Sequence, residues 1–360
     1  MSVLEVNDLV VHFETEDGLL RAVDGVSFAV EESKTLGIVG ESGCGKSVAN
    51  LSVLGLTRGP NTRISGSALF AGEDLVALET ERLRGIRGND VAMIFQDPLS
   101  SLHPFYTVGE QLVEAVQAHQ DVRDAAALKR SIEMLELVGI PDPAGRADHY
   151  PHEMSGGMRQ RVMIAMALVN EPKLLIADEP TTALDVTTQA QILQLLEHLQ
   201  DRLGMALIII THDLGVVAET ADRVAVMYAG LIVEDGTLAE IFYDPQHPYT
   251  WGLLGSLSRL DQPRPRRLPQ VPGMPPSLLA PPEGCHFRPR CPHEFERCPQ
   301  VPPLESRLAD APDHLDRCWL EPEDKRDRRE VEGRIGLAPA DSSSPSPAVP
   351  SGEGGPGAGT

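Results

Sequence analysis

The sequence predicts an α/β protein with a largely parallel sheet, followed by an extension rich in proline and cysteine. Three observations support this prediction. Over residues 1–240, short apolar runs typical of buried strands alternate with helical patterns, and such alternation is characteristic of parallel sheets. From about 241 to 320 the prolines become dense, which excludes most regular helix. Four of the 5 cysteines lie within one short part of that segment.

The strands of this sheet are expected at three apolar runs, residues 35–39, 174–177 and 207–210. A helical insertion is expected over about 97–160, because apolar residues within 108–118 and 125–137 recur close to the helix period. Beyond about 321 the chain is first charged and then rich in Ser, Pro, Gly and Ala. This composition predicts a disordered tail over 321–360.

The charge balance excludes one class of partner. The 360 residues include 53 acidic and 31 basic side chains, for a formal net charge of -22, so nonspecific binding to nucleic acid through phosphate neutralisation is not expected. No apolar run approaches the roughly 20 residues of a membrane span. The first nine residues contain no basic side chain, which is unlike a signal peptide. We therefore expect the chain in the cytoplasm, where clustered thiols favour metal binding over disulfides.

Residues 40–47 read Gly-Glu-Ser-Gly-Cys-Gly-Lys-Ser, the pattern of a phosphate-binding loop between a strand and a helix. Glycines let backbone N–H groups face phosphates, Lys46 would reach the β and γ phosphates, and Ser47 would bind Mg²⁺. Cys44 is either a small side chain tolerated in the loop or a thiol made oxidisable by the helix N-terminus. The predicted loop residues are Gly40, Ser42, Gly43, Cys44, Gly45, Lys46 and Ser47.

Two carboxylates, Asp178 and Glu179, follow the apolar run 174–177. Ligands of open α/β sheets bind at the carboxyl ends of the strands. Alone, the acidic pair could be a solvated strand end. Together with the phosphate-binding loop, it predicts that Asp178 holds Mg²⁺ through its hydration shell and that Glu179 orients and deprotonates the attacking water.

A second anion site is predicted at residues 154–161, which read Met-Ser-Gly-Gly-Met-Arg-Gln-Arg and precede a helical run. Ser155, Gly156 and Gly157 would stand at the helix N-terminus with exposed amides. A simple N-cap with glycines in the turn is the alternative for an isolated Ser-Gly-Gly. The position of the segment shortly before the acidic strand favours the anion site.

These segments together resemble the nucleotide-binding subunit of ABC transporters, and the resemblance covers residues 1–240. Besides the loop and the acidic strand, residues 95–98 (Phe-Gln-Asp-Pro) resemble the Q-loop and 154–158 the signature. Residues 183–185 (Ala-Leu-Asp) resemble the D-loop, and 211–213 (Thr-His-Asp) the segment with the switch histidine. The resemblance implies a P-loop NTPase (RecA-like) core with an antiparallel β subdomain and a helical insertion, which uses ATP and Mg²⁺.

The resemblance also implies roles for further residues. Gln96 would position MgATP together with Lys46 and Ser47, and His212 would contact the γ-phosphate and the attacking water. Two subunits would close head to tail, so that Ser155 and its glycines bind a phosphate held by the partner. The signature ends here in Met158 rather than Gln. We expect this difference to weaken phosphate binding little, because backbone amides and Ser155 bind the phosphate. Phe13 is the candidate for stacking on adenine. Asp185 is the candidate for communication with the partner's nucleotide site.

The segment after the core narrows the family. Residues 247–254 (His-Pro-Tyr-Thr-Trp-Gly-Leu-Leu) resemble the C-terminal segment of the ATPases of peptide and nickel importers, although they could be only a helix start with a packed aromatic. The resemblance implies an ATPase at the cytoplasmic face of the inner membrane. Its partners would be a second, different ATPase chain, two transmembrane permeases and, indirectly, an extracytoplasmic peptide-binding protein. A nickel importer, a soluble ABC ATPase and a redox-sensing module remain as alternatives.

The clustered cysteines predict a metal site in the extension over about 241–320. Their spacing, with 5, 6 and 19 residues between successive members, matches neither usual zinc motifs nor ferredoxins. The resemblance favours a [4Fe–4S] cluster, with Zn²⁺ or no metal as alternatives. A structural role is favoured over a redox switch, because a proline-rich segment gains order from any four-point anchor. The predicted ligands are Cys285, Cys291, Cys298 and Cys318.

Overall fold

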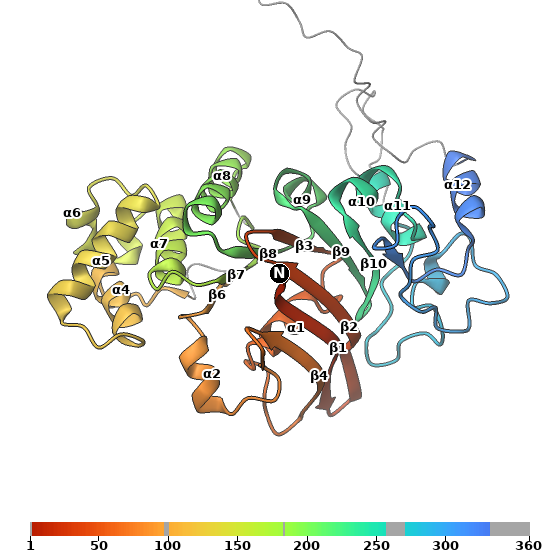
Figure 1. The fold of residues 1–360 in the computed structure, drawn as a ribbon, viewed down its shortest axis with the longest axis horizontal. Coiled ribbons are helices and arrows are strands. Elements are labelled where there is room, and N and C mark those ends of the chain that lie inside the picture. The colour runs from red at the N-terminus through yellow and green to blue at the C-terminus, as the bar shows by residue number, and fades with distance from the viewer. Residues whose placement is uncertain (1, 97–100, 183, 257–270, 332–360) are drawn as a thin grey trace, which may run out of the picture.

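The computed structural model describes residues 2–96, 101–182, 184–256 and 271–331 (Figure 1). Two sheets form the centre of the molecule, one mainly parallel and one antiparallel. Helices α4 to α7 lie at one end and the extension with α12 lies at the other (Figure 1). The predicted α/β class, with an antiparallel sheet and a helical region, is confirmed.

The main sheet has seven strands in the order β11-β10-β9-β3-β8-β7-β6. Strands β9, β3, β8, β7 and β6 run parallel, and β10 and β11 are antiparallel additions at one edge. Every residue of β3, β7 and β8 is buried, as expected for apolar strands covered on both faces. The bounds are β3 Thr35–Val39, β6 Val91–Ile94, β7 Leu174–Asp178, β8 Ala206–Thr211, β9 Arg223–Tyr228, β10 Leu231–Thr237 and β11 Leu315–Asp316.

The second sheet is antiparallel and has the order β2-β1-β4-β5. Its apolar face packs against α1 and the main sheet in one shared core that includes Leu4, Phe28 and Ile208. Residues 14–18, which look like an insertion in the sequence, contain the turn between β1 and β2. The bounds are β1 Ser2–Thr15, β2 Gly18–Glu31, β4 Thr62–Phe70 and β5 Glu73–Asp74.

Several helices begin at residues whose side chains cap the helix N-terminus, among them α4, α7, α8 and α10. Thr107 and Glu110 form a capping box at the start of α4, which satisfies amides that a helix end leaves unpaired. The helices predicted within 108–118 and 125–137 form as α4 and α5. The core helices are α1 Lys46–Val53, α2 Thr80–Ile86, α4 Val108–Gln117, α5 Asp124–Leu137, α6 Pro143–Ala147, α7 Gly156–Leu168, α8 Val186–Leu203 and α9 Leu214–Thr220, with a 3₁₀ turn at Pro151–Glu153.

The C-terminal part has more regular structure than its composition predicts. Helices α10 (Leu238–Tyr243) and α11 (Pro248–Gly255) form within it, and Pro248 is tolerated because it occupies the first turn of its helix. The 3₁₀ turn Arg288–Arg290 follows, and β11 pairs with β10 and so joins the extension to the main sheet.

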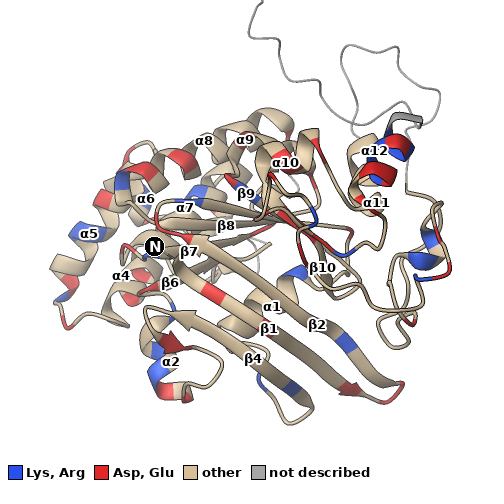
Figure 2. Ribbon diagram, turned by 45° about the vertical axis from the view of Figure 1, so that its right-hand side comes forward, with Lys and Arg blue, Asp and Glu red and all other residues tan. Residues whose placement is uncertain are grey.

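The prediction of a disordered tail over 321–360 was wrong for its first part, because Pro322–Val331 forms α12. Acidic and basic residues follow one another along this helix (Figure 2), and Lys325 is fully buried in an ion pair with Asp316. Tertiary contacts therefore order a segment whose composition is typical of disorder. The rest of that predicted tail, 332–360, lies outside the described residues.

None of the helices in the described ranges combines the length and the apolar character needed to span a bilayer.

Candidate nucleotide site

The loop 40–47 connects β3 to α1, as the sequence predicts. Two of its glycines are required by close backbone approach. A Cβ at Gly40 would lie 2.1 Å from the carbonyl oxygen of Met227, and one at Gly45 would lie 2.2 Å from that of Ala22. Gly45 also has φ 106°, in the left-handed region that glycine adopts readily. Any other residue at either position would displace the backbone of the loop.

Lys46 is 5% exposed and folds back over the loop. Its Nζ donates hydrogen bonds to the carbonyl oxygens of Gly40 (2.7 Å) and Glu41 (3.1 Å). Cys44 is also buried, and burial raises the pKa of its thiol. A thiol that stays protonated reacts slowly, so the structure favours the reading of Cys44 as a small side chain tolerated in the loop.

Ser47, at the start of α1, and Asp178, at the end of β7, converge at the edge of the parallel sheet. The Ser47 Oγ donates to Asp178 Oδ1 at 2.9 Å. Burial raises the pKa of Asp178, and the hydrogen bond from Ser47 opposes that effect. A hydroxyl and a carboxylate that meet beside a phosphate-binding loop are oxygen ligands of the kind that Mg²⁺ prefers, so these residues fit the ion.

Glu179 is held by three side chains from different segments. Its Oε2 accepts from Gln96 Nε2 and from Thr182 Oγ1, both at 2.8 Å. Its Oε1 lies 3.0 Å from His212 Nδ1, which donates in the tautomer protonated there. Glu179 has φ 47°, an uncommon backbone conformation that concentrates at functional sites. The predicted residues Gln96, Glu179 and His212 therefore meet in one place.

The carboxyl group of Glu179 is suited to accept a proton. Burial raises its pKa, but the hydrogen bonds from His212 and Thr182 outweigh burial, and the net pKa is lowered. Glu179 is therefore ionised at neutral pH. Sequence reasoning missed Thr182, whose only signal is its position three residues after Glu179 in the turn where Thr182 N–H donates to the Glu179 carbonyl oxygen.

Ser155 and the two glycines after it lie at the N-terminus of α7, where the Ser155 Oγ accepts from the Met158 N–H at 3.3 Å. They line a cavity of about 460 Å³. Asp185 lines the same cavity and caps α8 by accepting from the Thr188 N–H. Among the described residues, none from the loop 40–47 lines this cavity. The structure thus forms two separate sets of predicted residues, one around Glu179 and one around Ser155.

Phe13 lies on β1 opposite Leu20 and packs, partly buried, against the core shared by the two sheets. Its proposed stacking on adenine stays a prediction. Asp97 and Pro98 of the expected Q-loop and Ala183 of the expected D-loop lie outside the described residues.

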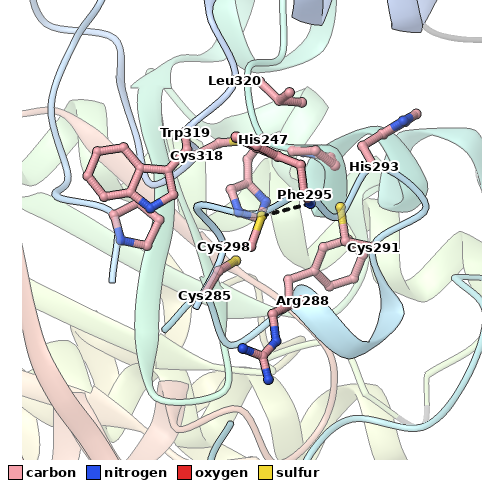
Figure 3. Close-up of a pocket in the computed structure, with 13 residues that line it drawn as sticks. His247, Cys285, Arg288, Cys291, His293, Phe295, Cys298, Cys318, Trp319 and Leu320 are labelled. Carbon is pink, nitrogen blue, oxygen red and sulfur yellow. Dashed lines mark hydrogen bonds between the residues drawn. The ribbon is translucent and has the colours of Figure 1, made fainter. Parts of the chain in front are cut away.

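The four cysteines of the extension line one cavity, together with His247, Phe287 and Trp319 (Figure 3). All four are reduced. Burial raises the pKa of both Cys291 and Cys318 to about 12. Within the described ranges, no three or more His, Cys, Asp or Glu side chains are arranged closely enough to hold a metal ion. The structure therefore brings the four predicted ligands to one cavity but does not arrange them as a metal site.

Two family matches cover most of the chain. Residues 23–182 match the family described as "ABC transporter". Residues 233–298 match "Oligopeptide/dipeptide transporter, C-terminal region", which includes residues 247–254 and three of the four clustered cysteines.

Solved structures similar to this chain are ABC cassettes. A dimeric ATP-binding cassette in a post-hydrolysis state, bound to ADP and Pi, is 26% identical with a TM-score of 0.58 and covers 65% of this chain and 98% of its own. The protein cbiO1 from Clostridium perfringens, part of the ABC transporter complex cbiONQ, is 30% identical with a TM-score of 0.56, over 67% and 90%.

Curated relatives match over nearly their whole length. The dipeptide transport ATP-binding protein DppD of Bacillus subtilis is 52% identical over 320 residues, which are 89% of this chain and 95% of the relative. The oligopeptide transport ATP-binding protein OppD of Salmonella typhimurium is 51% identical over 317 residues, 88% and 93%. The chain belongs to the ATP-binding subunits of ABC transporters of the oligopeptide and dipeptide importer type.

Proposed function

We propose that this chain hydrolyses ATP to drive the uptake of di- and oligopeptides through a membrane transporter. The observation that carries the proposal is Glu179, an ionised carboxylate held by Gln96, Thr182 and His212. It directly follows Asp178, which contacts Ser47 of the phosphate-binding loop. The names of the relatives, which are dipeptide and oligopeptide transport proteins, support peptides as the cargo.

In this proposal each group around the loop has a distinct task. Ser47 and Asp178 would hold Mg²⁺, which would supply positive charge that neutralises the phosphates. Lys46 leaves the carbonyl oxygens of Gly40 and Glu41 and donates to the β and γ phosphates. Glu179 accepts a proton from the attacking water, while His212 orients that water and contacts the γ-phosphate. Gln96 bridges Glu179 and the bound MgATP.

The cavity at Ser155 is proposed to receive a phosphate from a partner subunit. The exposed amides of Gly156 and Gly157 and the positive end of the α7 dipole favour an anion there. Asp185, across the same cavity, is placed to respond to that anion. A head-to-tail pair of ATPases would join this cavity to the partner's P-loop, and we propose that the partner is a second, different chain.

The permease contact is proposed at an apolar groove beside the Q-loop. A cavity of about 540 Å³ is lined by Met93, Phe95, Met163 and Met166. Phe95 is 43% exposed, and it directly precedes Gln96, whose amide contacts Glu179. A permease helix seated in the groove would therefore move Gln96. We also propose that the subunit lies on the cytoplasmic face of the membrane. Its nucleotide-binding core would comprise residues 1–240, with the helical part at about 97–160, and the cysteine-bearing extension residues 241–320.

For the four-cysteine cavity we propose a [4Fe–4S] cluster. The four thiols line one cavity and four thiolates satisfy such a cluster, but the described side chains are not arranged closely enough to hold a metal ion, so the thiols would have to move together when the cluster binds. Burial raises the pKa of Cys285, Cys291 and Cys318, so the iron of the cluster would have to stabilise the thiolates. Protein purified without oxygen should then be brown and contain about four iron atoms per chain. A colourless protein with stoichiometric zinc would contradict the iron assignment.

Uptake experiments test the function as a whole. The tagged chain should copurify with two membrane permeases, and a strain that lacks it should lose uptake of labelled dipeptide but keep uptake of Ni²⁺. Loss of Ni²⁺ uptake alone would identify a nickel importer instead. Copurification without any membrane protein would contradict a transport role.

A further inference from the structure

Glu41, the second residue of the phosphate-binding loop, links the loop to the C-terminal extension through its carboxylate and its backbone N–H. Its carboxylate accepts from both Nη atoms of Arg290, at 2.6 and 3.0 Å. Its backbone N–H donates to the Tyr249 Oη at 2.9 Å. Its carbonyl oxygen accepts from Lys46 Nζ at 3.1 Å. Two extension residues therefore hold Glu41, one of the two residues whose carbonyl oxygens accept from Lys46.

The contact between Arg290 and Glu41 is a built feature rather than a chance surface pair. The Arg290 side chain is 4% exposed, and an arginine has five N–H donors in a fixed fork. The structure supplies five acceptor contacts. Besides the two to Glu41, Nε donates to Pro272 O (2.8 Å), Nη2 to Val271 O (3.0 Å) and Nη1 to Tyr228 Oη (3.2 Å).

The segment that carries Arg290 also forms a wall of the cysteine cavity. The 3₁₀ turn at residues 288–290 lies between Cys285 and Cys291, whose backbone atoms hydrogen-bond to Arg288 at 3.0 and 3.1 Å. Phe287 lines the cavity and packs against Tyr249 with ring centroids 5.5 Å apart. Order in the cysteine segment therefore determines the position of both groups that hold Glu41.

We propose that Arg290 and Tyr249 are positioning residues for ATP, which act through Glu41 on Lys46. The inference rests on ATP binding by the loop and adds a role for the extension. When Lys46 turns to the phosphates, Glu41 loses a partner, and the extension keeps the loop backbone in place. Arg290 also neutralises a carboxylate that would otherwise repel the phosphates from close range.

Coupling of this kind is reciprocal. If the ordered extension strengthens ATP binding, then bound ATP must stabilise the extension by the same factor. A change in order at the cysteine cavity would thus change ATP affinity, and ATP binding would change order at the cavity, although Glu41 and Arg290 lie about 250 positions apart in the sequence.

The test is titration of MgATP into the full-length chain and three variants. Arg290→Gln leaves the Glu41 charge unpaired and should raise the Kd for ATP about tenfold. Glu41→Gln removes both the fork and the charge and should raise it only about threefold. The double variant should resemble Glu41→Gln, because the two residues act as one unit. The control Arg326→Gln removes an exposed arginine of α12 and should leave the Kd unchanged.

A second measurement separates positioning from folding. Tyr249→Phe removes only the hydroxyl that binds the Glu41 N–H and should raise the Kd about threefold, so it tests the proposal even if Arg290→Gln misfolds. In the assembled transporter, Arg290→Gln should raise the KM for ATP with kcat nearly unchanged. An unchanged Kd in folded Arg290→Gln and Tyr249→Phe, or an equal loss of affinity in Arg326→Gln, would overturn the proposal. Failure of the wild-type chain to bind ATP would instead refute the proposed function.

Discussion

The nucleotide-binding core and the C-terminal extension are stabilised by different interactions. In the core, completely buried apolar strands such as β3, β7 and β8 carry polar functional groups at their ends. In the extension, buried ion pairs join distant segments, as between Glu234 and His314 and between Asp316 and Lys325. A rigid apolar scaffold positions the polar groups at the ends of its strands, whereas buried ion pairs hold the extension together and join it to the core.

This difference predicts that substitutions in the two regions have different effects, on catalysis in the core and on folding in the extension. Removing a catalytic group from the core should stop the chemistry and leave the fold intact. Removing one partner of a buried ion pair in the extension should unfold that region, because a buried charge without a partner is costly. Removing one partner of an exposed ion pair should do neither.

The largest effect is expected for Glu179→Gln. The variant should bind ATP but hydrolyse it about 10² to 10⁴ times more slowly, because a general base contributes a factor of that size. The measurement is phosphate release by the assembled transporter together with ATP titration. Glu197→Gln, on the exposed face of α8, is the matched control and should behave like wild type. Wild-type turnover in Glu179→Gln would remove Glu179 as the base.

The next effect is expected for Lys325→Ala, which leaves the buried Asp316 without its partner. The side chains of this pair are 1% and 3% exposed, and breaking such a pair costs about 3–5 kcal/mol. Limited proteolysis should cut α12 and β11 rapidly while the core stays protected. The double variant Lys325→Met with Asp316→Leu should be cut more slowly, since it leaves no unpaired charge. Equal cleavage of both variants would contradict this explanation.

A pH dependence is expected at His314, which is buried against Glu234 with Nε2 and Oε1 2.8 Å apart. Burial lowers the pKa of His314, but Glu234 outweighs burial, and the net pKa is raised. The folded state thus binds the proton more tightly than the unfolded state does, so the stabilisation is complete below pH 6.5 and is lost as pH rises through the folded-state pKa. The protection of the amides in β10 and β11, corrected for the intrinsic rise of exchange with pH, should fall over that range.

His314→Gln is the control for this titration. Gln can still donate to Glu234 but carries no charge, so exchange in this variant should be faster at pH 6 and should no longer change with protonation at this site. If exchange in the wild type slows as pH rises above 6.5, the assigned direction is wrong.

The smallest effect is expected for Arg82→Gln. Arg82 pairs with Glu73 at the surface, where their side chains are 59% and 40% exposed, and exposed pairs contribute little because water and salt screen them. Thermal unfolding should be unchanged within error. A clear loss of stability in Arg82→Gln would contradict the view that the buried ion pairs of the extension stabilise the fold more than the exposed ion pairs of the core do.

The core could be predicted from the sequence because its information is local. The loop 40–47, the carboxylates after β7 and the capping serine at the start of α7 each occupy a few consecutive residues beside one strand or helix. The parallel sheet then brings strand ends together, so Glu179 and His212 could be expected to meet. The contact of Thr182 with Glu179 could not be predicted, because a lone threonine in a turn has no distinctive sequence pattern.

The extension could be predicted only in part because its determinants are long-range. The four cysteines share a cavity, as their clustering suggests, but nothing in the proline-rich sequence indicates that β11 joins the main sheet. The highly charged sequence of α12 is typical of disorder, and its helix is held by the buried pair of Lys325 with Asp316. Likewise, the contact of Arg290 with Glu41 joins residues 249 positions apart.

Hydrogen exchange of the full-length chain with and without MgATP tests most directly whether the extension is part of the nucleotide site. If Arg290 and Tyr249 hold Glu41 as described, MgATP should slow exchange of the amides at 285–291 as well as those of the loop 40–47. Helix α2 serves as the internal reference, because its arginines Arg82 and Arg84 pair with Glu73 and Glu81 and not with either of these two regions. Protection confined to the loop, with 285–291 unchanged, would contradict the account.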